Sequence, residues 1–179
     1  MNRTARVGAA AAVAAVTGLW MAGCTGAAPP TTPESDQTAR PVVDHQGYGA
    51  IRFGDTRADL ERDHGLTQRP GDCAPRLPGH PEISPVLDPD DRLVLVWVNP
   101  PLQTPVGIGV GTPVDAVRRA HPDAEELAAP PGTQRFDGLL VTVADRAYLY
   151  LHDGTEVRKV IVGYADYARL LFDEGFGTC

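Results

Sequence analysis

The sequence predicts an α+β fold made of two related units, each a short helix (or two) packed on an antiparallel sheet. Two observations predict it: a segment pattern that occurs twice, and several β-rich runs separated by turn residues. The 179 residues include 16 Lys+Arg against 23 Asp+Glu, a formal net charge of -7, and 42% hydrophobic residues. This composition is typical of a globular chain of one domain or two small ones, and its acidity argues against nucleic-acid binding.

The repeated segment covers residues 51–65 and again residues 108–122. In both copies a short apolar stretch leads to a glycine, Gly54 or Gly111, and an apolar residue follows six positions later. A residue that breaks helices then ends each copy. The pattern predicts a short strand that leads into a short helix in each unit.

The two predicted helices carry signals at their ends. Thr56 with Asp59, and Thr112 with Asp115, have the spacing of a capping box in which Asp replaces Glu. Gly65 predicts a left-handed cap at the end of the first helix. Because each helix is only about nine residues long, it must pack on a sheet to be stable.

Four further runs predict the strands of the sheet, which the helices are expected to cover on one face. The runs are residues 92–99, 139–144, 146–152 and 156–164. Asp153-Gly154 predicts a tight hairpin turn between the last two strands. The first unit then covers about residues 47–104 and the second about residues 105–179.

The first 23 residues have the layout of a secretory signal peptide, with two early arginines, an apolar middle and small residues near a cleavage site. Met21-Ala22-Gly23-Cys24 resembles the lipobox of bacterial lipoproteins, with Met21 where Leu is usual. The resemblance implies lipidation of Cys24 and an anchor on the extracytoplasmic face of the cell membrane. The alternatives are an uncleaved membrane helix, or a secreted protein cut near Ala27-Ala28.

Residues 24–41 predict a lipidated cysteine and a Pro-rich tether, because they contain no large apolar side chain. The exported α+β domain then covers residues 42–179. Two cysteines remain if Cys24 carries lipid, and export allows them to be oxidised. We therefore expect a Cys73–Cys179 disulfide, with a frayed, free Cys179 as the alternative.

The Gly-led helix followed by antiparallel strands is similar to two exported families. One is the SmpA/OmlA type of outer-membrane assembly lipoprotein, and the other is the β-lactamase inhibitory protein, which carries such a unit twice. The ending Glu174-Gly175-Phe176-Gly177-Thr178-Cys179 also looks like that of actinobacterial lipoproteins built from such units. The resemblance implies the fold and transfers no catalytic residue.

Motifs for chemistry are sparse. The sequence has no H-E-x-x-H, no C-x-x-C and no serine in a nucleophile motif, so we expect no metal, no cofactor and no enzymatic activity. His64 and His121 hold equivalent positions at their helix ends, where a cationic imidazole would favour the helix dipole. Tyr148 and Tyr150 share one face of a strand, either as a partner-binding surface or as part of the core.

These observations predict a lipid-anchored lipoprotein of the cell envelope whose folded part is a non-catalytic binding or assembly module. Its expected partners are the membrane, through the anchor at Cys24, and another envelope protein. The alternative is an inhibitor-like domain that acts against an extracellular hydrolase.

Overall fold

The computed structural model describes residues 41–133 and 135–176, which all belong to one compact unit of residues 37–179. The predicted signal peptide, Cys24 and nearly all of the tether lie outside the described residues. The helices are α1 (Arg57–His64), α2 (Val114–Ala120) and α3 (Ala165–Glu174). The strands are β1 (Gly47–Tyr48), β2 (Ile51–Arg52), β3 (Ile83–Leu87), β4 (Leu93–Val98), β5 (Glu125–Leu127), β6 (Asp137–Val143), β7 (Arg146–His152) and β8 (Val157–Tyr164).

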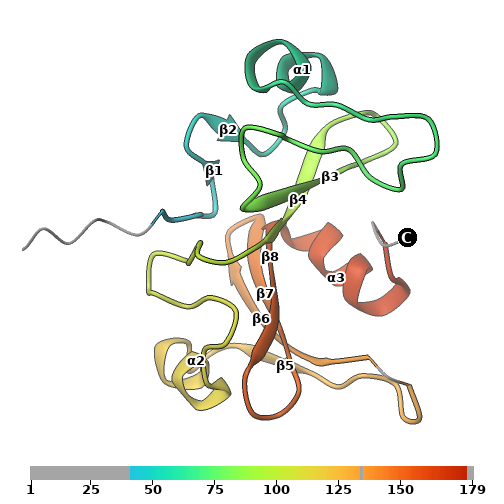
Figure 1. The fold of residues 1–179 in the computed structure, drawn as a ribbon. Helices are drawn as coiled ribbons and strands as arrows, with labels where there is room; N and C mark the ends of the chain where they lie inside the picture. Colours follow the sequence, from blue (N-terminus) through green and yellow to red (C-terminus); the bar gives the residue numbers. More distant parts are fainter. Residues whose placement is uncertain (1–40, 134, 177–179) are drawn as a thin grey trace, which may run out of the picture. The chain divides into compact units, whose positions relative to one another are not determined.

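A six-stranded antiparallel sheet in the order β3-β4-β8-β7-β6-β5 forms the centre of the unit, and β1 and β2 form a separate two-stranded sheet (Figure 1). The predicted α+β class is confirmed. Strand β4, from the first predicted unit, pairs with β8 from the second. The strands of the two units therefore share one sheet.

Two of the sheet's connections depend on an aspartate that satisfies backbone N–H groups. In the β3–β4 turn, one carboxylate oxygen of Asp88 accepts hydrogen bonds from the backbone of Asp90 and Arg92. In the predicted turn between β7 and β8, Asp153 accepts from the backbone of Thr155 and Glu156 at 2.9 and 3.0 Å. These bonds lower the pKa of Asp153 to about 2.

Each face of the sheet carries its own hydrophobic cluster, because successive side chains of a strand point to opposite faces. On β7, Tyr148 and Tyr150 belong to one cluster and Leu149 and Leu151 to the other. The cluster that contains the tyrosines also holds Leu60 of α1 and buried residues of α2. We call this side of the sheet the tyrosine face.

Helix α3 covers the opposite side, which we call the α3 face, and lies beside β8 and β4 (Figure 1). Its Ala168, Leu171 and Phe172 are buried in the second cluster. The expectation that the helices cover only one face is therefore wrong. Helix α3 has no start signal in the sequence, because it begins directly after β8 and its N-cap, Tyr164, makes no side-chain hydrogen bond.

The two repeated segments differ more in structure than in sequence. Thr56 and Asp59 form the predicted capping box of α1, and Gly65 ends the helix with a φ of 66°. By contrast, α2 has Pro113 as its N-cap and no side-chain cap, so the second predicted capping box is wrong. The Thr112 hydroxyl instead accepts from the backbone N–H of Gly109 and stabilises a turn where the repeat predicted a strand.

Candidate functional site

The two tyrosines nominated from the sequence lie in the core. Tyr150 is fully buried and Tyr148 is 6% exposed, and their rings stack with centroids 6.3 Å apart. Burial raises the pKa of both phenols. They therefore offer no surface to a partner, and the partner-binding interpretation of Tyr148 and Tyr150 gives way to the core interpretation, because α1, α2 and the segment before β1 cover this face.

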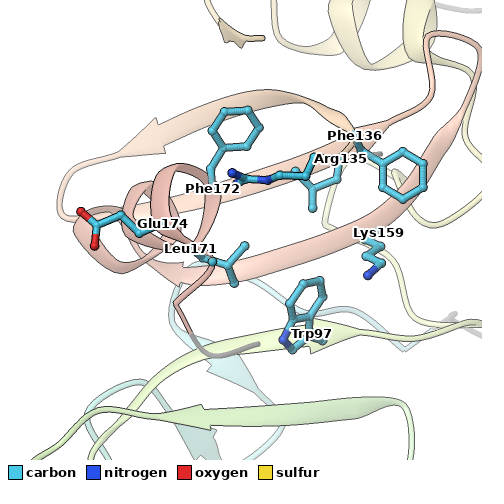
Figure 2. Close-up of a pocket in the computed structure, with 9 residues that line it drawn as sticks. Trp97, Arg135, Phe136, Lys159, Leu171, Phe172 and Glu174 are labelled. Atoms are coloured by element: carbon cyan, nitrogen blue, oxygen red, sulfur yellow. The ribbon is translucent and has the colours of Figure 1, made fainter. Parts of the chain in front are cut away.

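Part of the α3 face is not covered by any of the described residues. Helix α3 ends at Gly175, where the backbone turns into the left-handed region with a φ of 81°. Beyond this end lies a hollow of about 410 Å³ between the helix and the strands (Figure 2). It is lined by Trp97, Arg135, Phe136, Leu151, Lys159, Leu171, Phe172, Glu174 and Gly175.

The strand register places Trp97 and Lys159 next to each other on the floor of this hollow. Lys159 of β8 pairs with Leu151 of β7, and Trp97 of β4 pairs with Ile161, two residues further along β8. Trp97 and Lys159 are therefore diagonal neighbours on the same face. The Lys159 ammonium lies 5.0 Å from the centroid of the Trp97 ring, which is within the range of a cation–π interaction.

A second cation–aromatic pair forms the opposite wall. The Arg135 guanidinium lies 5.5 Å from the centroid of the Phe172 ring, and its Nη1 donates to the backbone carbonyl of Asp173 at 3.3 Å. Phe172 approaches the sheet closely because residue 138 is a glycine. A Cβ on Gly138 would lie 3.1 Å from the Phe172 ring and 3.2 Å from Leu149.

The hollow continues past Trp97 toward the segment that follows β4. An adjacent hollow of about 420 Å³ shares Trp97 and Lys159 with the first and extends to Pro100 and Val110. A third hollow of about 290 Å³ shares Pro100 and Val110 with the second. We call the three hollows together the Trp97 groove.

Charged side chains in the groove differ in how they are compensated. Arg158, which lines the second hollow, forms ion pairs with Asp153 and Glu156 at 2.7 and 2.5 Å. By contrast, Lys159, which is the chain's single lysine, forms neither a hydrogen bond nor an ion pair with any described residue. Glu174 lines the first hollow, but its carboxylate points away from Lys159 (Figure 2).

The histidines have structural surroundings. His121 caps the C-terminal end of α2, as its position predicted, and its Nε2 lies 3.4 Å from the Tyr150 hydroxyl. Burial lowers the pKa of His121, so the fold favours the neutral imidazole over the cationic form that the helix dipole would favour. Within residues 41–133 and 135–176, no group of three or more His, Cys, Asp or Glu side chains could hold a metal ion.

The structure describes one of the two cysteines of the predicted disulfide. Cys73 is disulfide-bonded, and Cys179 lies outside the described residues. The pairing of Cys73 with Cys179 therefore stays a prediction. Cys24, the predicted lipidation site, also lies outside the described residues.

The comparisons with known proteins place the chain in no family. No family model, no curated protein and no solved structure matches it. In the described part of the chain, no helix has both the length and the apolar character needed to cross a membrane.

Proposed function

We propose that this protein is a lipid-anchored lipoprotein of the cell envelope whose folded unit is a non-catalytic module that binds another protein. The observation that carries the binding role is the Trp97 groove, a concave, partly aromatic surface on an otherwise well-packed sheet. Half-buried aromatic rings beside exposed cationic side chains around a hollow are typical of binding surfaces. The anchor rests on Met21-Ala22-Gly23-Cys24 and the Pro-rich residues that follow.

The side chains of the first hollow support binding rather than catalysis. Its lining has two cations, three aromatic rings, one carboxylate and aliphatic surface, with no His, Cys, Ser or Thr among them. A nucleophile with an adjacent base, or two facing carboxylates, would be needed for the common hydrolytic mechanisms. Neither arrangement occurs among the residues that line this hollow.

Metabolic labelling tests the anchor. Cells that produce the full chain are grown with radioactive palmitate, and the protein is recovered from membrane and soluble fractions. The full chain is expected to carry label and to sediment with the membranes, whereas Cys24→Ser should lose the label and enter the soluble fraction. Cys179→Ser is the matched control, because it also replaces a cysteine by serine but leaves Cys24 in place, and it should keep the label whether or not it breaks the predicted disulfide.

Two results contradict the anchor. One is an unlabelled wild-type chain, and the other is a Cys24→Ser chain that keeps its label. Recovery of the wild-type chain from the cytosol in its uncleaved form would contradict the location in the envelope as well.

A further inference from the structure

We infer that the Trp97 groove binds an extended acidic segment of a partner protein, with a carboxylate on Lys159 and an apolar side chain against Trp97 and Phe136. The inference rests on the proposed function in one respect, that the module acts by binding another protein. It adds the chemistry of the segment that is bound and the residues that recognise it.

The charge of the groove favours an acidic ligand. Each other cation beside Trp97 has a polar partner in the described part of the chain: Arg158 pairs with carboxylates and Arg135 with a helix carbonyl. Among the described residues, Lys159 has the Trp97 ring as its one such contact. A carboxylate that enters the hollow would therefore meet a lysine ammonium that no acidic side chain already neutralises.

The ammonium of Lys159 is held in one position by its contact with Trp97. A lysine on an exposed strand is ordinarily free to extend into water, because its stem is flexible. Here the ammonium lies 5.0 Å from the centroid of the half-buried Trp97 ring, and both residues line the first two hollows, so the contact holds the charge where these hollows meet. Binding of a ligand would then cost less conformational entropy of the Lys159 side chain than binding to a freely rotating lysine would.

The remaining charges determine where the carboxylate lies. The last carbonyls of α3 carry the negative end of the helix dipole, and Glu174 lies at the same end. The Arg135 guanidinium at this end is already engaged, because it donates to the carbonyl of Asp173. An acidic group is therefore favoured on the Trp97 side of the groove and disfavoured beside Gly175.

The shape of the groove favours a peptide over a lipid surface. The three hollows follow one another from α3 to the segment around Pro100, which suits an extended chain. A bilayer would require a protruding surface, whereas Trp97 is half-buried at the floor of a concavity. The net charge of -7 also opposes adsorption of the chain to anionic lipid.

The single lysine gives a direct probe of this site. Reductive methylation of the full chain, purified in non-ionic detergent, with ¹³C-formaldehyde labels Lys159 and preserves its charge. Lys159→Arg identifies the signal, because this variant leaves only the terminal amine to be labelled. The Lys159 signal should also show the ring-current shift of a stacked indole, and Trp97→Ala should remove that shift.

Binding is measured with a panel of short capped peptides that carry Glu and Phe at varied spacings. At least one peptide should move the Lys159 signal. Its Glu→Gln counterpart should bind about tenfold more weakly, since the charge pair is lost. Affinities of the variants are measured by titration calorimetry, which does not need the Lys159 label. Lys159→Gln should bind the acidic peptide more weakly by a similar factor and bind the Gln counterpart as the parent chain does, whereas Lys159→Arg should keep most of the affinity.

Three results overturn the inference. They are equal binding of the Glu and Gln peptides, no response from any acidic peptide, and a response to phosphatidylglycerol added to the detergent in place of a response to peptide. If neutral or basic peptides bind in the groove while acidic ones do not, the inference fails and the proposed binding role stands. The palmitate experiment fails or succeeds independently of all these outcomes.

Discussion

The two faces of the six-stranded sheet are made by the same strands and are completed in different ways. On the tyrosine face, Leu60 of α1, Val117 of α2 and Val43 are buried in one cluster with Tyr150, which is itself fully buried. On the α3 face, one helix of 10 residues covers part of the surface and ends at Gly175. Within the described ranges, one face is therefore closed, and the other has an open groove beside Trp97.

This difference separates two roles that aromatic residues can have in a small domain. Tyr148 and Tyr150 contribute buried area, and their polar atoms contact the protein itself, including His121. Trp97 lies in the same sheet, but its ring holds a lysine ammonium at the surface. The comparison predicts that substitutions on the tyrosine face change stability, whereas those in the groove change binding.

The largest expected effect comes from Tyr150→Ala. Removal of a fully buried ring leaves a cavity beneath α2 and His121, and comparable substitutions cost about 3–5 kcal/mol. The free energy of unfolding, measured by urea denaturation of the full chain, should fall by this amount. Such a loss is a large fraction of the stability of an ordinary domain.

Trp97→Ala is the matched control, because it also truncates an aromatic residue on a central strand. Its half-buried ring borders solvent, so the expected loss is below that of Tyr150→Ala. If the two variants lose the same stability, or if Trp97→Ala loses more, the distinction between a closed and an open face is wrong.

The sequence identified the tyrosine face better than the groove. Period-two alternation correctly placed Tyr148 and Tyr150 together and Leu149 and Leu151 on the other side. Alternation alone does not say which face is covered, because a covering helix such as α3 can lie anywhere in the sequence. Because α3 was not predicted, one face of the sheet was expected to stay uncovered, and the sequence did not say whether the tyrosines or the leucines of β7 lie on it.

The residues of the groove come from positions far apart in the chain. Trp97 and Lys159 become neighbours only through the pairing of β4 with β8, which the predicted division into two units did not anticipate. One signal was available in the sequence. The chain's single lysine, Lys159, lies in a β-rich run, where a charge marks a solvent-facing position.

A smaller effect is expected from Gly138→Ala on the α3 face. The added methyl would press on the Phe172 ring at 3.1 Å and on Leu149 at 3.2 Å, and overpacking of this kind costs roughly 1–3 kcal/mol. The loss is measured by urea denaturation. It should shrink in a Phe172→Ala background, because the ring that obstructs the methyl is then absent.

Gly79→Ala is the control for the loss of a glycine, since nothing lies within 4 Å of a Cβ at that position. It should change stability by about 0.5 kcal/mol or less. If Gly138→Ala lowers the free energy of unfolding equally in the parent chain and in the Phe172→Ala background, contact with the Phe172 ring is not what excludes a side chain at position 138.

The smallest effect concerns pH and the tyrosine face. Burial lowers the pKa of His121 below the ordinary value of 6.5, and it does the same for His152 on β7. A lowered pKa means that the unfolded chain binds the proton more readily, so this contribution to stability is present above pH 6.5 and is lost as the pH falls through the folded-state pKa. Urea denaturation at a series of pH values should therefore show a fall in stability below about pH 6.5 that is smaller in His121→Asn and smallest in His121→Asn/His152→Asn.

Trp97→Ala should keep the slope of the parent chain, because nothing that titrates on the tyrosine face has changed. A slope that the two histidine substitutions leave unaltered would contradict the conclusion that this face holds its imidazoles neutral.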